Sequence, residues 1–314
     1  MRDTTRPQAN RERWNLLGAG SLGCLFAAYL TRAGIDLRTL LRDAATLQQL
    51  RAAGGITVQR TGRDDLQPVV SALASDEAEA PIARLLICTK AQQTLAAIDA
   101  LKPRLAPSPV LVLLQNGMGV RELLQRAVPD AIIIHALSTE GAYRLDRFHI
   151  VHAGIGETLF GSADPAQQRH AEEAVRELNC ELAFAAVPDI EQRLWRKLAV
   201  NSVINPLTAL HRCRNGELPG IDGIGALIVE LCEELAAVAQ ADGQALTAEA
   251  ARAAVYAVIH STSANRSSML QDRLAGRRSE IDFINGFVVA RGQAHGIACP
   301  RHEQLLRAIK AFEA

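Results

Sequence analysis

The stretch that decides the fold is WNLLGAGSLGCLFAAYLTRAG, from Trp14 to Gly34. A short apolar run meets the turn GAGSLG, and a helix-length apolar segment follows until Gly34 stops it. This order predicts a strand, a glycine turn and a helix, in which Gly18 allows the tight turn, Gly20 admits a pyrophosphate and Gly23 permits close helix–strand packing. The alternative is a glycine turn without a ligand. We expect a dinucleotide to contact the whole loop, which comprises Gly18, Ala19, Gly20, Ser21, Leu22 and Gly23.

A second strand is expected from Leu37 to Leu41, and it should end near the adenosine ribose. An NAD enzyme usually has an acidic residue there, about 20 positions after the glycines, whereas this chain has Arg42. Because a guanidinium binds a 2′-phosphate through paired hydrogen bonds, Arg42 favours NADP (NADPH) as the cofactor. Asp43 follows directly and is suited to a ribose hydroxyl, and a merely solvated Arg42 is the other alternative.

Short apolar runs bounded by turn signals continue the predicted parallel sheet. They span Leu85–Thr89, Val110–Leu114 and Ala131–Leu137, and polar residues stand at their ends. Because open α/β sheets hold ligands at the carboxyl ends of their strands, Lys90 and Asn116 are candidate ligand contacts. Lys90 is alternatively a surface lysine that opens the next helix.

The remaining strands of the first half have weaker signals. A hairpin region is expected from Ile56 to Ser71, and the glycine-punctuated stretch Tyr143–Gly161 predicts antiparallel strands that close the sheet. The helix Ala166–Asn179 and the strand Leu182–Ala186 complete this domain, and Val187–Asp189 is a natural junction.

From Ile190 onward the sequence contains helix-length segments and no convincing strand. We therefore predict an α/β fold with an N-terminal Rossmann-type dinucleotide-binding domain, residues 14–188, and an all-helical C-terminal domain, residues 189–314. Residues 1–13 are charged and are expected to form a disordered extension. The segments expected to be helical after the first are Ile224–Asp242, Thr247–Ser261, Asn265–Leu274, Glu280–His295 and Arg301–Phe312.

The segment Leu194–Leu218 combines an apolar helix with a polar stripe. Lys197, Asn201 and Asn205 recur every fourth residue, so a helix keeps them within a stripe roughly 80° wide. The flanking residues are too apolar for a free surface helix, so the stripe either faces solvent beside a deep core or carries function. Pro206 follows Asn205, which predicts a kink or a freed backbone carbonyl here.

Two further segments hold polar groups suited to recognition. Residues 263–272, SANRSSMLQD, concentrate hydroxyl and amide groups, and Glu280 places a carboxylate at the start of an apolar helix. Taken alone, each also fits the plain role of capping a helix or interacting with its dipole.

Composition excludes several classes of partner. The 34 Lys and Arg residues balance 34 Asp and Glu residues, so no bulk charge attracts nucleic acid or an anionic membrane. No run approaches the roughly 20 apolar residues of a membrane span, and no signal peptide is evident. Six scattered cysteines without a CxxC argue against disulfides and a metal site. We expect a soluble cytoplasmic protein, and the apolar stretch 224–239 leaves a homodimer open.

Seven short motifs occur in order along the chain: GAGSLG, TKAQQ, LLQNGMG, LWRKLAVNSVINPLTAL, RNGEL, SSMLQD and EIDFINGF. With these motifs the chain closely resembles the ketopantoate reductase family, from about Trp14 to Arg307. The resemblance implies a Rossmann domain followed by a helical domain. It also implies reduction of 2-dehydropantoate, a small-molecule 2-keto acid, to (R)-pantoate with NADPH in pantothenate biosynthesis.

The resemblance further implies roles for individual residues. Lys197 matches the family's catalytic lysine and Glu280 its active-site glutamate. One departure is Glu140, which stands where close relatives are expected to carry His or a small residue, and which affects the wall of the site. Substrate-binding positions match Asn116, Asn201, Asn205, Asn265 and Ser268, and Asn285 falls in the same motif as Glu280. Cofactor-binding positions match the loop Gly18–Gly23, Arg42, Lys90, Gln93 and Asn116.

Such a reduction needs a hydride at the carbonyl carbon and a proton at its oxygen. Lys197 is expected to supply the proton and a positive charge, with its pKa lowered from about 10.4 by partial burial. Glu280 is expected to orient the substrate hydroxyl or the lysine. The alternatives are a reductase of another branched 2-keto acid and, in a different class, a protein that senses NADP(H) without turnover.

Overall fold

The structure is a computed structural model that describes residues 13–79 and 81–313. The chain forms two compact units. The first contains every strand of the described residues and ends at Pro188. The second comprises the chain from Asp189 onward together with two short segments, Lys90–Leu95 and Gln115–Leu123.

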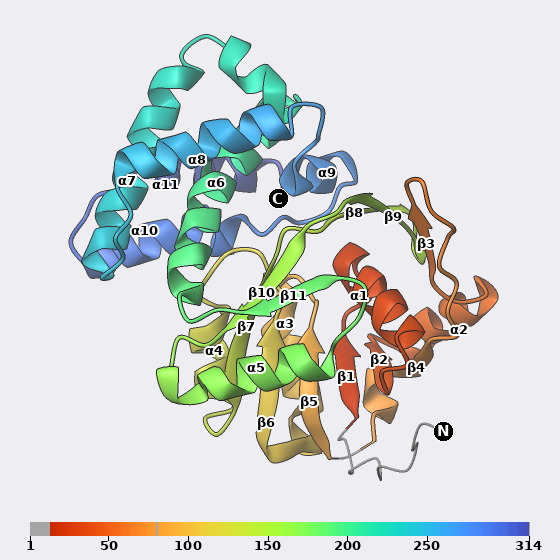
Figure 1. Cartoon of the computed structure of the whole chain (residues 1–314). Helices are drawn as coiled ribbons and strands as arrows, with labels where there is room; N and C mark the ends of the chain where they lie inside the picture. Colours follow the sequence, from red (N-terminus) through yellow and green to blue (C-terminus); the bar gives the residue numbers. More distant parts are fainter. Residues whose placement is uncertain (1–12, 80, 314) are drawn as a thin grey trace, which may run out of the picture. The chain divides into compact units, whose positions relative to one another are not determined.

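The main sheet of the first unit has eight strands in the order β11-β10-β7-β6-β5-β1-β2-β4 (Figure 1). Neighbouring strands are parallel except β10 and β7, which are antiparallel. Strand β1 is buried at all four of its residues, as a central strand of a parallel sheet should be. The strands are β1 (Trp14–Leu17), β2 (Leu37–Leu41), β4 (Ser71–Ala74), β5 (Ile82–Ile87), β6 (Leu105–Leu113), β7 (Ile132–Ser138), β10 (Glu157–Gly161) and β11 (Ala183–Ala186).

Helices connect the strands, which confirms the predicted Rossmann-type order. Helix α1 packs against β1 and β2, and α5 packs against β7, β10 and β11. Short 3-10 turns lie at 75–77, 102–104 and 165–167. The helices of this half of the chain are α1 (Ser21–Arg32), α2 (Ala44–Ala52), α3 (Ala91–Leu101), α4 (Val120–Ala127) and α5 (Gln168–Glu177).

A second sheet of three strands differs from two of the sequence predictions. Strands β3 (Thr57–Arg60), β9 (His149–Gly154) and β8 (Gly141–Asp146) pair in this order, and α1 contacts both sheets. The prediction that the whole stretch 143–161 closes the main sheet was therefore wrong, because only β10 joins it. The predicted hairpin in 56–71 is reduced to one bridge between Val58 and Leu66. Alternation of apolar residues identifies a strand but not its partner.

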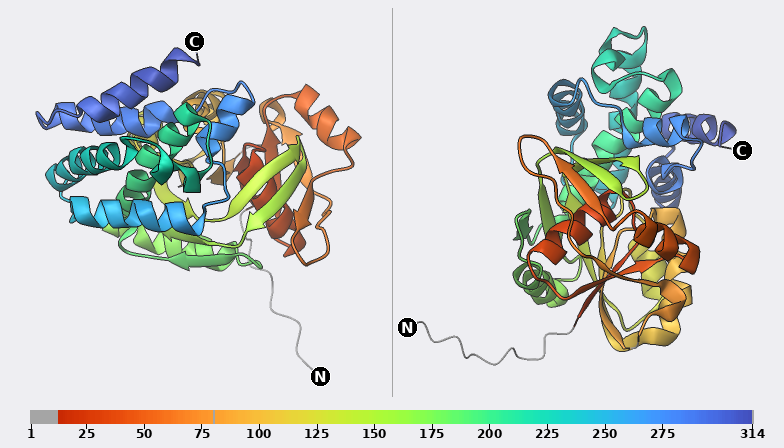
Figure 2. Two further views of the ribbon diagram at one scale, coloured as in Figure 1. Left: turned by 90° about the horizontal axis from the view of Figure 1, so that it is seen from above. Right: turned by 90° about the vertical axis from the view of Figure 1, so that its right-hand side faces the viewer.

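The second unit is helical, as predicted, and α6 lies at its centre. This helix contacts α7, α8, α9 and α11, and α10 and α11 lie side by side (Figure 2). The apolar residues of α7 that left a homodimer open pack largely into this core. The helices are α6 (Ile190–His211), α7 (Ile224–Ala241), α8 (Ala248–Ser261), α9 (Ser268–Leu274), α10 (Asn285–Ala294) and α11 (Pro300–Ala311), with 3-10 turns at 215–220 and 281–283.

The predicted helix Glu280–His295 is interrupted. Residues 281–283 form a 3-10 turn, and Ile284, with φ −105° and ψ −88°, separates it from α10. The prediction of one continuous helix was therefore wrong at this point, and the break frees backbone groups of Phe283 for other contacts.

Pro206 lies inside α6 and frees one carbonyl, as the sequence predicts. Proline has no N–H to donate to the residue four positions earlier, which is Ser202. The side chain of Asn285 fills this gap, because its Nδ2 donates to Ser202 O at 2.9 Å. The second Nδ2 hydrogen faces His302 Nδ1 at 3.0 Å, and His302 Nε2 faces Leu231 O at 3.1 Å. A neutral His302 with its proton on Nε2 satisfies both of its contacts.

Several other expectations concern the ends and surfaces of the chain. Residues 1–12 of the expected disordered extension lie outside the described residues, and Arg13 forms an ion pair with Asp36 at 2.9 Å. Among the described residues, no helix is long and apolar enough to cross a membrane. All six cysteines are free thiols, and burial raises the pKa of Cys24 to about 12.

The buried His302 predicts a specific loss of stability in acid. Burial lowers its pKa from 6.5 to about 4, so between these values the unfolded chain binds a proton that the folded chain does not. Unfolding therefore becomes more favourable as the pH falls through this window, by about 3 kcal/mol at most. We expect His302→Gln to be less stable at pH 7 but to lose less stability between pH 6.5 and 4, as measured by urea unfolding. The exposed His260 supplies the control, since His260→Gln should show the same dependence of the free energy of unfolding on pH as the wild-type protein. Equal slopes for all three proteins would contradict the assignment.

Candidate functional site

The glycine loop of the first unit has the geometry that its sequence predicts. Gly18 has φ +101°, and a Cβ there would lie 2.7 Å from Thr89 N. A Cβ at Gly23 would lie 2.0 Å from Gly18 O, so the start of α1 approaches the strand–turn junction too closely for any side chain. At Gly20, the N-cap of α1, a Cβ would meet Cys88 O only at 3.7 Å. The loop thus leaves backbone N–H groups at a helix start, an arrangement that suits phosphate groups.

Arg42 and Asp43 follow β2 and differ in their hydrogen-bond partners and in their exposure to solvent. Asp43 is the N-cap of α2 and accepts from both the backbone N and the Oγ1 of Thr46, at 2.7 and 2.6 Å. These hydrogen bonds lower the pKa of Asp43 to about 2. Arg42 is 79% exposed and pairs with Asp43 through Nε at 2.9 Å. Asp43 is therefore committed to the helix, while the guanidinium extends into solvent.

The polar stripe of α6 belongs to the second unit. Lys197 and Asn201 are half-buried and Asn205 is buried, so the stripe does not lie open to solvent. Burial lowers the pKa of Lys197 to about 8, and the negative charge of Glu280 opposes this shift. The stripe therefore carries a lysine that titrates near neutral pH, close to a carboxylate.

Glu280 joins two segments that follow strands of the main sheet. Its Oε1 accepts from the backbone N of Ala91 at 3.0 Å, and its Oε2 accepts from Asn116 Nδ2 at 3.4 Å. Burial raises the pKa of the Glu280 carboxyl, and these two hydrogen bonds and the charge of Lys90 oppose the rise. All these residues lie in the second unit. Glu280 thus brings the first turn of α3 and the loop around Asn116 to one point.

Lys90 is bound by α9 and by the segment that follows it. Its Nζ lies 2.6 Å from Asp272 Oδ2 and donates to Arg278 O at 2.8 Å. The side chains of Lys90 and Asp272 are 29% and 10% exposed, so the ion pair is partly shielded from water. Gln93, on the same turn, is exposed.

The loop around Asn116 is fixed by a close backbone approach. Gly117 has φ +81°, and a Cβ at this position would lie 2.3 Å from Phe283 O. The backbone N of Met118 donates to the same carbonyl at 2.8 Å. The break after 281–283 therefore provides the acceptor that holds Asn116 next to Glu280.

The polar groups at the start of α9 are anchored to α6. Ser267 is the buried N-cap, and its Oγ accepts from Leu270 N at 3.1 Å and from Thr208 Oγ1 at 2.7 Å. The next residue, Ser268, is exposed, as is Asn265.

Comparisons with known proteins decide the family. The ketopantoate reductase PanE/ApbA family model matches residues 14–165, and the model of the family's C-terminal part matches residues 189–313. The chain is 36% identical over 301 residues to the 2-dehydropantoate 2-reductase of Vibrio cholerae, covering 95% of this chain and 97% of that protein. The chain belongs to the ketopantoate reductase PanE/ApbA family.

Solved structures agree with this family and its fold. A PanE/ApbA family ketopantoate reductase from Ralstonia eutropha JMP134 is similar with a TM-score of 0.84 and 28% identity, over 96% of this chain and 98% of that one. D-mandelate dehydrogenase, solved with NADH and anilino(oxo)acetate, has a TM-score of 0.88 at 21% identity over 96% and 98% of the two chains. At that identity the likeness shows the fold alone.

Glu140, which departs from the pattern expected for the PanE/ApbA family, takes part in a buried hydrogen-bond network of the first unit. The Glu140 side chain is fully buried, and its Oε2 lies 2.6 Å from His152 Nε2 and accepts from Gly156 N at 3.1 Å. His152 Nδ1 in turn lies 3.0 Å from the hydroxyl of Tyr29 on α1. His152 therefore links α1 to the small sheet, and Glu140 holds its imidazole and the backbone of Gly156.

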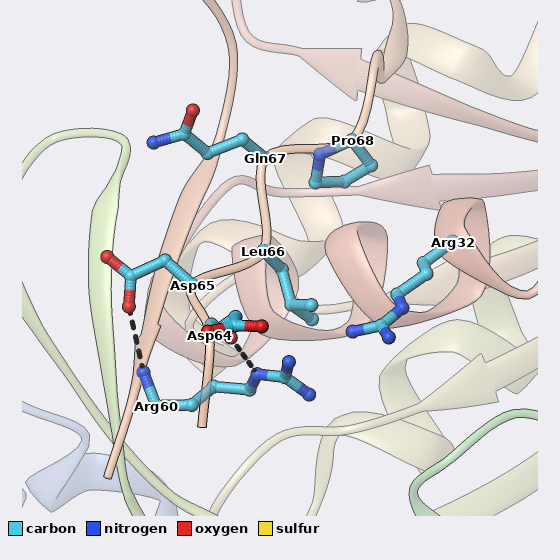
Figure 3. A pocket seen from close by; sticks show the side chains of 7 residues that line it. All are labelled: Arg32, Arg60, Asp64, Asp65, Leu66, Gln67 and Pro68. Carbon is cyan, nitrogen blue, oxygen red and sulfur yellow. Dashed lines mark hydrogen bonds between the residues drawn. The ribbon is translucent and has the colours of Figure 1, made fainter. Parts of the chain in front are cut away.

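Figure 3 shows a surface hollow of the first unit that contains none of the site residues predicted from the sequence. Its volume is about 400 Å³, and Arg32 and Arg60 extend toward each other across it. Glu181 forms ion pairs with both guanidinium groups, at 3.4 and 3.2 Å. Its walls are Arg32, Arg60, Asp64, Asp65, Leu66, Gln67 and Pro68.

Three residues of the motifs quoted above were not singled out individually from the sequence. Asp272 lies in the motif SSMLQD, and nothing local indicates its contact with Lys90. Gly117 lies in LLQNGMG, and the glycine itself is the only local sign of a positive φ or a close backbone approach at this position. Asn215 lies in RNGEL; it is buried, its Nδ2 donates to Thr262 Oγ1 at 2.8 Å, and its Oδ1 has no hydrogen-bond partner among the described residues.

The close approach at Gly117 predicts a large effect of a single methyl group. Gly117→Ala adds a left-handed non-glycine residue, which costs about 1–2 kcal/mol, and a clash with Phe283 O that costs about 1–3 kcal/mol more. Gly243 is a matched control, because its φ is +79° and a Cβ there would meet no described atom within 4 Å. Chemical unfolding should show a clearly larger loss for Gly117→Ala than for Gly243→Ala. Equal losses would mean that the loop moves away from Phe283 at no cost.

Proposed function

We propose that this chain is an NADPH-dependent 2-dehydropantoate 2-reductase that forms (R)-pantoate in pantothenate and coenzyme A biosynthesis. The observation that carries the proposal is Lys197, a half-buried lysine with a pKa of about 8 that senses the charge of Glu280. The family, and the substrate named for the Vibrio cholerae relative, support the same reaction.

The cofactor-binding groups proposed for the first domain, residues 14–188, fit a dinucleotide phosphate. A Cβ at Gly18 or Gly23 would collide with backbone, so the glycines are required for the tight turn at the start of α1. Arg42 is exposed and would hold the 2′-phosphate, while Asp43 is bound to Thr46 and is less available to a ribose hydroxyl. When bound, NADPH supplies the hydride. Lys90, Gln93 and Asn116 are proposed as further contacts on the nicotinamide side.

Lys197 is proposed to deliver the proton to the ketone oxygen. An acid with a pKa of about 8 is mostly protonated at neutral pH and yet donates more readily than a free lysine. Its positive charge also stabilises the alkoxide that develops on this oxygen, and partial burial strengthens that interaction. Lys197 thus combines acid catalysis with electrostatic stabilisation.

Glu280 is proposed to orient the substrate rather than to exchange the proton. Both carboxylate oxygens are engaged, by Ala91 N and by Asn116 Nδ2, so the group is held in a fixed direction. A fixed carboxylate can accept a hydrogen bond from the substrate hydroxyl, and its charge counteracts the fall in the pKa of Lys197. Loss of this residue would therefore change both orientation and proton donation.

The carboxylate and the polar groups of the keto acid need donors that add no further buried charge. Asn201 and Asn205, on the same face of α6 as Lys197, are proposed for this role. Ser268 is proposed to bind the substrate carboxylate, and Asn265, exposed three residues earlier, to assist it. These contacts belong to the helical domain, residues 189–314, for which we propose substrate binding and catalysis.

The reaction is tested with purified protein, NADPH and a panel of branched 2-keto acids, by following the absorbance of the reduced nicotinamide. We expect turnover to be fastest with 2-dehydropantoate, and kcat/KM to fall about tenfold per pH unit above about pH 8, where Lys197 loses its proton. Lys197→Ala should lower kcat by about 100- to 10,000-fold while NADPH still binds. The exposed neighbour Arg196 gives the control, since Arg196→Ala should keep kcat. Faster turnover of another keto acid would replace the substrate, and tight NADPH binding without any turnover would indicate a sensor.

Cofactor choice is tested separately at Arg42. A guanidinium that binds the 2′-phosphate should contribute about 10- to 100-fold to NADPH affinity, as charged hydrogen bonds do. We expect Arg42→Ala to raise the Kd of NADPH by this factor and that of NADH by less than about threefold, as measured by nicotinamide fluorescence. Arg51→Ala removes another exposed arginine of the same region and should change neither Kd. Equal weakening of both cofactors by Arg42→Ala would remove Arg42 from 2′-phosphate recognition.

A further inference from the structure

Helix α9 is too short to hold its own position. It has seven residues, and an isolated helix of this length has little stability in water. Its N-cap is tied to α6 by Thr208 Oγ1, which donates to Ser267 Oγ at 2.7 Å. At its other end, Arg273 donates to the carbonyls of Ala209 and Leu210. These contacts fix α9 to α6 on one side only.

A second contact holds α9 from another direction. Asp272 is displaced by about 100° around the helix from Arg273, and its Oδ2 lies 2.6 Å from Lys90 Nζ. Its Oδ1 also pairs with Arg277 Nε at 3.1 Å, but Arg277 follows α9 within three residues, so this contact ties the helix to no other element. Ser268 stands four residues before Asp272, so the two side chains share a face within about 40°. The ion pair with Lys90 therefore resists rotation of the face that presents Ser268.

Lys90 is itself held in place by further hydrogen bonds of its own segment. It also donates to Arg278 O at 2.8 Å, and the next residue, Ala91, donates its backbone N–H to Glu280 at 3.0 Å. The same short segment is thus bound by the turn after α9 and by Glu280. An ion pair with side chains 29% and 10% exposed is weakened by water and salt less than a surface pair would be.

We propose that Asp272 is a positioning residue that acts through its ion pair with Lys90. The ion pair holds α9 in the orientation in which Ser268, together with Glu280 and Asn116, recognises the substrate and Ser268 binds its carboxylate. This inference rests on the proposed function for the identity of the ligand. Asp272 acts through α9 and exchanges no proton with the substrate, so its loss weakens substrate binding more than it slows the chemical step.

The test is a double-mutant cycle with Asp272→Asn and Ser268→Ala, assayed with saturating NADPH and varied 2-dehydropantoate. We expect Asp272→Asn to raise KM about 5- to 30-fold with kcat within about threefold of wild type. Because Asp272 acts through Ser268, the double variant should have nearly the KM of Ser268→Ala alone. Effects that multiply, or an unchanged KM in Asp272→Asn, overturn the proposal.

Asp242 supplies a matched control in the same unit. Its side chain is 11% exposed and pairs with Arg291 and with His295. Asp242→Asn removes an equally buried ion-paired carboxylate away from α9, so it should leave KM within about twofold of wild type. A rise in KM equal to that of Asp272→Asn would show that general destabilisation is the cause, and would overturn the proposal.

A measurement that needs no turnover separates this proposal from the proposed function. Hydrogen exchange of the backbone amides in residues 267–276 should become at least about threefold faster in Asp272→Asn and stay unchanged in Asp242→Asn. Unchanged exchange in Asp272→Asn overturns the role of the ion pair whatever the enzyme reduces. Faster exchange in a protein that reduces no 2-keto acid would support the role of the Asp272–Lys90 ion pair in holding α9, although the proposed reaction would then be wrong.

Discussion

The half-buried carboxylate of Glu280 is the constraint on which the surrounding part of the second unit depends. An ionised carboxyl away from water is unfavourable unless donors surround it, and the donors here come from two segments that follow different strands. Ala91 donates its backbone N–H at the start of α3, and Asn116 donates its side-chain amide. Both segments group with the helices rather than with the strands they follow. The hydrogen bonds to Glu280 thus attach both segments to the helical unit, together with the contacts of Met118 with Phe283 and of Lys90 with Asp272.

The same carboxylate sets the electrostatics around Lys197. Burial and Glu280 act on the pKa of Lys197 in opposite directions, and the result of about 8 lies well below that of a free lysine. Glu280 is in turn influenced by Lys90, whose charge is paired with Asp272. The charges alternate in sign from Asp272 through Lys90 and Glu280 to Lys197. Lys90 and Asp272 act on the pKa of Glu280 in opposite directions, and Glu280 in turn raises the pKa of Lys197.

Much of the fold could be predicted from the sequence because its signals are local. The glycine loop, the parallel strands and the helical second half follow from residue spacing, and the freed carbonyl follows from Pro206 alone. The candidate lysine was found by its four-residue spacing with Asn201 and Asn205 in an apolar helix. Predictions failed where the answer depends on a distant partner. The pattern of β8 and β9 does not say which sheet they join, and nothing near Gly117 reveals Phe283 O. The ion pair between Lys90 and Asp272 likewise joins residues whose sequences carry no mark of each other.

Pro206 and Asn285 illustrate a dependence that acts over evolutionary descent rather than within one molecule. Asn285 is needed at Ser202 O because Pro206 removed the donor that a helix normally provides. If Asn285 were lost first, a buried carbonyl would be left unpaired, whereas an earlier loss of Pro206 would restore the helical donor and release Asn285 from half of its task. The order of the two substitutions therefore decides the stability of the intermediate variant. Loss of Pro206 first keeps a donor at Ser202 O, whereas loss of Asn285 first leaves this buried carbonyl without one.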